Sequence, residues 1–328
     1  MFWPKSPAAG LSPPRPWQEA SSVYSAPSTA QHSAEILDDQ ETLEGALPRH
    51  LQTLQVQWML HRHRALSPVH TAGNARTVFD LACGNGAHLQ IFADSGWSGW
   101  GVDINPISIK GILSSQAGRR GLIEAVQGDL NALGTTLPAP HHKADLVLMC
   151  YGTICTLPPG TVDRITRFAW ESLKPGGLWM LDIITPEYFS SPRQPSLEEL
   201  IRDGDDPEGG HTSGALLLDQ KTYLSPWLGF WGALPKRVIE STWYYPTENL
   251  YCEDYSVAKQ RFLTWKRPYT PQEYRTRYRS RGFLHCTTES GSFGQTPPRD
   301  DGSRSDIPSG WSTLVFQKSG RGNKNEDV

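Results

Sequence analysis

The fold of this chain is decided by the stretch Val78-Phe79-Asp80-Leu81-Ala82-Cys83-Gly84-Asn85-Gly86-Ala87-His88-Leu89. A short apolar run ends in an acid, a loop of small residues follows, and the sequence can then form a helix. This order predicts a buried parallel strand, a tight turn and a helix N-terminus, which is where open α/β sheets bind ligands. Because glycine has no Cβ, Gly84 and Gly86 allow positive φ angles and let a ligand lie directly on the backbone.

Two classes of cofactor use such a turn, and two positions separate them. A dinucleotide site requires G-x-G-x-x-G, whose third glycine lets the helix pack closely on the strand, but the third position here is Leu89. Asp80 would repel a pyrophosphate and attract a cationic ligand. S-adenosylmethionine (SAM) carries an ammonium and a sulfonium and has no phosphate. It is therefore compatible with Asp80 and with Leu89 in place of the third glycine. Asp103 does not separate the classes, because NAD sites have an acid at a similar distance from the loop.

At these residues the sequence resembles the class I SAM-dependent methyltransferases of the small-molecule type. The first motif of that family is an acid-containing strand followed by a G-x-G loop, and this chain has Ala82 where the family most often has glycine. Four more features follow in the family's order: the strand-like runs 99–105, 123–130 and 144–152, and the turn Leu173-Lys174-Pro175-Gly176-Gly177 before a fifth strand.

The resemblance implies which residues hold SAM. Asp80 would lie near the methionine ammonium, Asp103 would bind the ribose hydroxyls, and Asp129 would bind the adenine amine. The other expected cofactor contacts are Ala82, Cys83, Gly84, Gly86, Ile104, Leu130 and Cys150. Tyr151, at the end of the fourth strand, is the candidate contact to the methyl acceptor. No catalytic residue is assigned, and no metal is expected.

The expected reaction is transfer of a methyl group to nitrogen or oxygen of a small molecule by in-line displacement, for which the protein mainly supplies alignment. The N-P-P-[YF] motif of nucleic-acid amino-methyltransferases is absent, and Cys150-Tyr151-Gly152-Thr153 stands in its place. Two alternatives stay open, a nucleotide-dependent oxidoreductase and a protein that binds SAM without catalysis.

The SAM-binding core is expected to span residues 73–185. Residues 1–38 are rich in Pro, Ser and Ala and are predicted to be disordered. Residues 39–72 predict an N-terminal helical cap that is broken at Pro48. Its apolar stripe would include Leu51, Leu54, Trp58 and Leu60.

An insert after the fifth strand, residues 186–268, is expected to recognise the substrate, because the family often carries such additions there. It begins with a polar loop, 190–214, and continues with three strand-like runs at 237–246, 249–259 and 261–267. An aromatic face stabilises a cationic group, so the candidate substrate contacts in the insert are Trp227, Trp231 and Tyr245.

Residues 269–318 return to the core. Thr270 and Glu273 form the pattern of a capping box at a helix start, and runs at 283–287 and 313–317 predict two strands antiparallel to each other. Residues 319–328 are a polar tail, expected to be disordered. The predicted fold is therefore α/β: a Rossmann-like, seven-stranded, mostly parallel sheet whose last strand is antiparallel, with an N-terminal helical cap and an antiparallel β insert.

Composition limits the partners. The 328 residues carry a formal net charge of −3, which argues against a protein that mainly grips nucleic acid. No apolar run approaches the roughly 18 residues that span a bilayer. The five cysteines form no C-x-x-C pair and are odd in number, which favours reduced thiols in the cytoplasm. The expected partner is a small-molecule substrate, and the sequence does not predict an oligomeric state.

Overall fold

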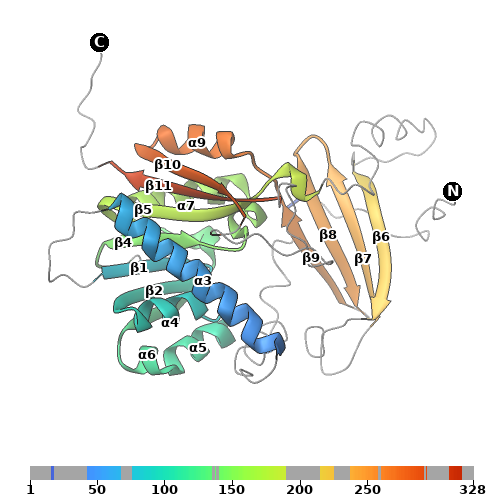
Figure 1. Ribbon diagram of the computed structural model, residues 1–328. Coiled ribbons are helices and arrows are strands. Elements are labelled where there is room, and N and C mark those ends of the chain that lie inside the picture. Colours follow the sequence, from blue (N-terminus) through green and yellow to red (C-terminus); the bar gives the residue numbers. More distant parts are fainter. Residues whose placement is uncertain are drawn as a thin grey trace, which may run out of the picture.

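The structure is a computed structural model (Figure 1). It describes residues 16–17, 43–67, 76–134, 137, 140–189, 215–224, 237–257, 260–291, 293 and 310–319. The candidate contacts Trp227 and Trp231 lie outside the described residues, as does nearly all of the segment 1–38.

The core is a seven-stranded sheet in the order β10-β11-β5-β4-β1-β2-β3. Its strands are β1 (Arg76–Leu81), β2 (Trp97–Asp103), β3 (Ile123–Gln127), β4 (Ala144–Met149), β5 (Leu173–Ile184), β10 (Phe283–Ser290) and β11 (Trp311–Lys318). Strands β1 to β5 pair in parallel, and β11 runs antiparallel to both of its neighbours. The predicted fold class is confirmed.

Helices cover both faces of this sheet (Figure 1). They are α3 (Leu43–Leu66), α4 (Ala87–Asp94), α5 (Pro106–Ser114), α6 (Gln116–Arg119), α7 (Pro159–Ser172) and α9 (Pro271–Arg279), with 3-10 turns η1 (Leu130–Ala132), η2 (Thr153–Thr156) and η3 (Pro186–Tyr188). Because successive strand residues point to opposite faces, Val78 of β1 packs with α3, α4 and α5. Its neighbour Phe79 belongs to the cluster that α7 and α9 complete.

The turn of residues 173–177 is part of β5 rather than a separate connection. Helix α7 ends at Ser172 and β5 begins at Leu173. The register with β4 shifts between the pairs Ala144–Leu173 and Leu146–Leu178, so Pro175 and the two glycines occupy an irregular start of the strand.

Helix α3 is continuous, and the predicted break at Pro48 is wrong. The proline removes one backbone hydrogen bond near the helix start, and burial of Val56 and Met59 downstream stabilises the helix. The predicted apolar stripe is partly wrong. Trp58 and Leu60 pack against the core, but Leu51 is 37% exposed. The buried residues of the helix are Gln55, Val56, Met59 and His63. Their spacing of three or four still describes one helix face.

The insert is a second, antiparallel sheet in the order β6-β7-β8-β9. Its strands are β6 (Leu216–Leu224), β7 (Arg237–Tyr245), β8 (Leu250–Val257) and β9 (Gln260–Lys266). The three predicted strands are present. The sequence did not predict β6, since all nine of its residues are exposed or only partly buried and it lacks an alternating pattern.

One face of the insert buries Trp243, Tyr245, Cys252, Leu263 and Trp265 among others. Trp17, from the segment predicted to be disordered, packs against this cluster with its ring centroid 6.0 Å from that of Trp265. At this residue the structure differs from the expectation, because a large aromatic side chain finds an apolar surface far away in the sequence.

The capping box at α9 yields a stability prediction. Thr270 accepts a hydrogen bond from the Glu273 backbone, and the Glu273 carboxylate accepts one from the Thr270 backbone at 2.7 Å, as the sequence predicted. Thr270→Ala should lower the free energy of unfolding by about 1 kcal/mol, measured by urea denaturation. Thr276→Ala, in the exposed interior of the same helix, is the matched control and should not destabilise. Equal effects of the two variants would contradict the capping role.

Candidate functional site

A cavity of about 420 Å³ lies at the carboxyl ends of β1, β2 and β4, a size typical of small-molecule sites. The predicted site residues that line it are Asp80, Ala82, Cys83, Gly84, Asp103, Ile104, Asp129, Leu130, Cys150 and Tyr151. The sequence therefore identified one continuous pocket from residues spread over 72 positions of the chain (151 minus 80, inclusive).

Two predicted residues are placed elsewhere. Gly86 precedes α4 with φ of 76°, and a Cβ there would lie 2.6 Å from Ile112 of α5. Its role is thus to let two helices meet. Tyr245 is buried in the insert cluster and is not among the residues that line the cavity.

The loop after β1 has positive φ angles at Ala82 (63°) and Gly84 (53°). At Gly84 an added Cβ would have no described atom within 4 Å, so the backbone there is open to a ligand. At Ala82 the left-handed conformation costs an alanine about 1–2 kcal/mol. This conformation explains why glycine is common at the equivalent position in the family that the loop resembles.

Leu89 fills the space between α4 and β2. A Cβ on Gly101 would lie 2.7 Å from its Cδ1, and one on Gly99 would lie 3.0 Å from its Cδ2. The close contact between helix and strand therefore uses glycines of the strand, with the large residue on the helix. This is the reverse of the dinucleotide pattern, in which the glycine is on the helix side.

Asp103 joins the loop to the end of β2. Its Oδ2 accepts a hydrogen bond from the Gly84 backbone at 2.8 Å, and its Oδ1 accepts one from the Asn105 backbone at 2.9 Å. Burial raises the pKa of Asp103, and these hydrogen bonds oppose that rise. A carboxylate has about four acceptor positions, so Asp103 can still bind hydroxyl groups of a ligand.

Asp80 is 1% exposed, and its Oδ2 has no hydrogen-bond partner within the described part of the chain. Burial, and secondly the charge of Asp103, raise the pKa of Asp80 to about 8. Near neutral pH the carboxyl group is therefore mostly protonated in this environment. A cation beside it would favour the charged form, so the pair of acids suits a positively charged ligand.

Asp129 lies at the start of η1. Its Oδ1 accepts hydrogen bonds from the backbone and the side chain of Asn131, at 2.8 and 2.9 Å. The cavity also includes Gly128, whose backbone donates to the Asp103 carbonyl at 2.9 Å. The acids that follow β2 and β3 thus line the same cavity.

Tyr151 and Gly152 follow β4 with φ of 61° each. Asp182 of β5, which is fully buried, accepts a hydrogen bond from the Gly152 backbone at 2.6 Å and so fixes this turn. Tyr151 is 50% exposed, and its hydroxyl donates to Gln55 Oε1 at 3.3 Å. Burial raises the pKa of Tyr151.

The sequence did not identify the residues of α3 and α4 in this site. His88 Nε2 lies 3.0 Å from Gln55 Oε1, and burial lowers the pKa of His88 to about 4. The unpredicted lining residues are Gln52, Asn85, Ala87, His88, Asn105, Ser108, Gly128, Asn131, Thr153, Thr156 and Leu157. The sequence does contain a pattern that indicates this role: Gln52 and Gln55 are three residues apart, so they share a helix face, and the apolar Val56 and Met59 stand beside them.

The described residues include no metal-binding cluster and no helix able to cross a membrane. They contain no group of three or more His, Cys, Asp or Glu side chains that could hold a metal ion. Their helices also include none with the length and hydropathy needed to cross a membrane.

Residues 78–177 match the model of a family described as a methyltransferase domain. None of the curated proteins matches the chain. Among solved structures, the CcbJ methyltransferase from Streptomyces caelestis aligns with a TM-score of 0.53 and 15% identity, over 82% of this chain and 89% of that one. A SAM-dependent methyltransferase from Clostridium acetobutylicum aligns with a TM-score of 0.55 and 13% identity, over 88% and 99%.

At these identities the solved structures show the fold. The family match adds the activity: residues 78–177 are similar to a methyltransferase domain, and the prediction of a methyltransferase enzyme is confirmed. The matched residues extend from β1 into β5, the part of the sheet that forms the cavity.

The left-handed Ala82 yields a prediction. Ala82→Gly should raise the free energy of unfolding by about 1 kcal/mol, because relief of backbone strain exceeds the extra freedom of glycine in the unfolded chain. Chemical denaturation measures the change. Ala87→Gly, in the first turn of α4, is the control and should destabilise. A loss of stability in Ala82→Gly would show that the loop is not strained.

Asp80 should make stability depend on pH. Its pKa of about 8 in the fold lies above the value of about 3.8 that it has in the unfolded chain. Its contribution to stability is therefore complete below pH 4 and is lost as pH rises to 8. Asp80→Asn should therefore gain stability relative to the wild type as pH rises through this range, by about 1.4 kcal/mol for each pH unit. Urea denaturation of both proteins at pH 5, 6.5 and 8 measures the difference. If the free energies of unfolding of the wild type and Asp80→Asn changed with pH in the same way, the raised pKa of Asp80 would be contradicted.

Proposed function

We propose that this protein is a methyltransferase that moves the methyl group of SAM to nitrogen or oxygen of a small-molecule acceptor by in-line displacement. The observation that carries the proposal is the buried Asp80 carboxyl, without a described hydrogen-bond partner for Oδ2, beside Asp103 and an open glycine backbone. These groups suit a cationic nucleoside without phosphate.

The residues around the cavity fit SAM. Asp80 would neutralise its ammonium, the backbone at Gly84 would contact its methionine portion, and Asp103 would bind its ribose. Asp129 and Leu130 would hold the adenine, and Cys150 would lie near the sulfur. SAM supplies a methyl group on a sulfonium, an excellent leaving group. The chain has to align the acceptor and exclude water.

A dinucleotide fits these residues less well. Asp80 and Asp103 are close enough for the charge of one to raise the pKa of the other, and a pyrophosphate would add negative charge to the pair. The packing of Leu89 against Gly99 and Gly101 also differs from the dinucleotide pattern. These observations argue against the oxidoreductase alternative.

Tyr151 is proposed to orient the acceptor. Because its hydroxyl hydrogen points to Gln55, its oxygen can accept a hydrogen bond from an N–H or O–H group of the acceptor. Neither Tyr151, whose pKa is raised, nor His88, with a pKa of about 4, is a useful base near neutral pH. An uncharged amine needs no base to attack the methyl group, whereas a hydroxyl does, so these residues favour nitrogen.

The insert is proposed to recognise the rest of the acceptor. The Arg267 backbone, after β9, donates to the Cys155 carbonyl in η2 at 2.8 Å, and η2 also contains the cavity residues Thr153 and Thr156. Tyr251 of β8 stacks on Phe189 with ring centroids 3.7 Å apart. The insert is therefore in contact with the turn η2, which supplies cavity residues, and with the chain after β5.

Tyr244 and Tyr251 are cross-strand partners, with ring centroids 4.6 Å apart. Since neighbouring strand residues point to opposite faces, Tyr244 faces away from the cluster that buries Tyr245. Like Tyr245, however, Tyr244 and Tyr251 are buried and do not line the cavity, so neither replaces Tyr245 as a candidate acceptor contact. Trp227 and Trp231 stay candidates.

All five cysteines are free thiols, which suits the reducing cytoplasm where we propose that the enzyme acts. The formal net charge of −3 gives no reason to propose a nucleic acid as acceptor.

Calorimetric titration tests the cofactor. The wild type should bind SAM and not NADH, and Asp103→Asn should weaken SAM binding at least tenfold, because a charged hydrogen-bond acceptor for the ribose is lost. Asp163→Asn is the control: this α7 residue is half exposed and pairs with Arg277 of α9, so SAM affinity should not change. Binding of NADH without SAM would favour the oxidoreductase.

Turnover tests catalysis. Tritiated SAM incubated with the protein and cell extract should give a labelled small molecule, and mass spectrometry should place the methyl group on nitrogen. SAM binding without any labelled product would favour the non-catalytic alternative.

A further inference from the structure

Helix α3 connects the cavity to strand β10. Gln52 lines the cavity, and Gln55 contacts Tyr151 and His88. Trp58 and Arg62 follow on the same side of the helix, at spacings of three and four residues. At 1.5 Å per residue they lie about 9 and 15 Å from Gln52 along the helix axis.

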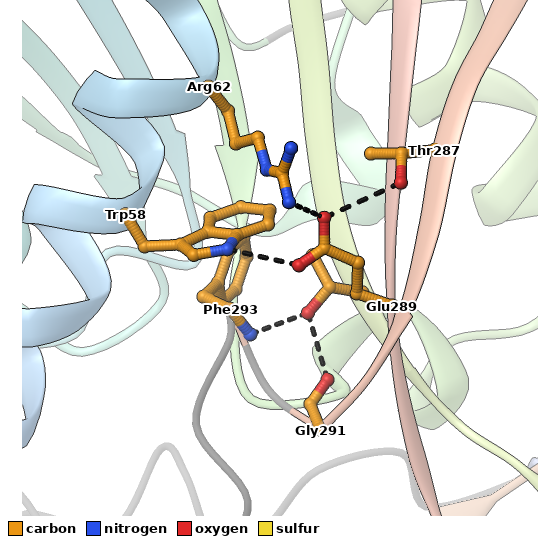
Figure 2. Close-up of polar contacts among 7 residues, drawn as sticks. Trp58, Arg62, Thr287, Glu289, Gly291 and Phe293 are labelled. Carbon is orange, nitrogen blue, oxygen red and sulfur yellow. Dashed lines mark hydrogen bonds and ion pairs between the residues drawn. The ribbon is translucent and has the colours of Figure 1, made fainter.

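Glu289 of β10 binds both Trp58 and Arg62 (Figure 2). Its Oε2 accepts a hydrogen bond from Trp58 Nε1 at 3.1 Å, and its Oε1 forms an ion pair with the Arg62 guanidinium. Thr287 of the same strand donates to Oε1 at 3.4 Å. The guanidinium also lies 5.4 Å from the centroid of the Trp58 ring. The Glu289 carboxylate thus binds side chains from two successive turns of α3.

Phe293 provides a fixed surface for Trp58. It is fully buried, and its ring meets that of Trp58 edge to face at a centroid distance of 6.0 Å. Its backbone N–H donates to Thr313 Oγ1 of β11, and this hydroxyl donates to the Gly291 carbonyl at 2.9 Å. The chain after β10 is therefore tied to the sheet where α3 meets it (Figure 2).

Two other positions of α3 have directional contacts: Gln55 binds His88 and Tyr151, and the Leu66 carbonyl at the helix end accepts a hydrogen bond from Gln317 Nε2 of β11 at 2.7 Å. Between them, packing of apolar side chains fixes the helix less sharply than the contacts of Glu289 do. Val56 and Met59 are buried in the apolar cluster below the helix, and apolar packing is not directional. The contacts of Glu289 are directional, because a carboxylate binds its donors in defined geometry. They are also only partly desolvated, since the Glu289 and Arg62 side chains are 23% and 35% exposed, so they can open without leaving a buried charge.

We propose that Glu289 is a positioning residue: through Trp58 and Arg62 it holds α3 where Gln52 and Gln55 meet the cavity and Tyr151. The proposal rests on the proposed function, since it places SAM in that cavity. When the Glu289 contacts are lost, α3 shifts on its apolar face, the wall formed by Gln52 loosens, and SAM leaves faster. The apolar packing of α3 keeps the fold intact.

The rate of SAM release tests this role. Tritiated SAM is bound to the full-length protein and chased with excess unlabelled SAM. Glu289→Gln, which keeps an acceptor for Trp58 and loses the ion pair, should raise the release rate about tenfold, the effect of losing one hydrogen bond to a charged group. The charge exchange Glu289→Arg with Arg62→Glu should restore most of the wild-type rate. Asp163→Asn, which removes an ion pair between α7 and α9, is the matched control and should have no effect.

Hydrogen exchange separates this proposal from the proposed function. Glu289→Gln should speed amide exchange in residues 52–62 and leave α7 unchanged. Unchanged exchange in α3, or an unchanged release rate from a wild type that binds SAM, would overturn the role of Glu289. Failure of the wild type to bind SAM would instead reject the proposed function, and exchange in α3 would still decide whether Glu289 positions the helix. If Glu289→Gln does not fold, Trp58→Phe, which removes only the indole N–H, serves in both measurements.

Discussion

The Asp103 carboxylate holds together the two chain segments that make the cavity. Through Gly84 and Asn105 it receives backbone hydrogen bonds from the loop after β1 and from the start of α5. Parallel pairing of β1 with β2 brings these segments to one edge of the sheet. Without a fixed acceptor at that edge, the Gly84 amide would have to find another partner and the loop would lose its shape. The same oxygens keep free acceptor positions, so in the proposed function one residue both fixes the loop and binds the ribose.

Much of the core could be predicted because its signals are local. The stretch 80–86 combines an acid at the strand end with a loop of small residues, and the Thr270–Glu273 pattern satisfies the backbone of its own helix. Strand residues such as those of β1 and β4 form short apolar runs between turns, which is typical of parallel strands buried on both faces. Each of these patterns depends on chemistry within a few residues of the chain.

The parts that the sequence did not predict depend on contacts between distant residues. Whether Tyr244 or Tyr245 faces the core is decided by strand pairing, and a change of one residue in register exchanges the two faces. Trp17 finds Trp265 on the insert, and no local pattern predicts that contact. In α3 the apolar positions allowed more than one buried face, and the contacts of Gln55 with Tyr151 and His88 show which face is used.

The cavity is an example of stability given up for binding. Two carboxyl groups lie near each other in a buried environment, and burial raises the pKa of both. A cation that enters meets groups already in position and needs no rearrangement of the loop, because Asp103 has fixed it. Binding energy that would otherwise be spent on ordering the site becomes available as affinity. The same arrangement disfavours anions, since a phosphate gains no attraction from a neutral Asp80 and is repelled by an ionised carboxylate nearby in a medium that screens charge poorly. In the proposed function, preference for a positively charged nucleoside therefore follows from the cost that two neighbouring buried acids impose on the fold.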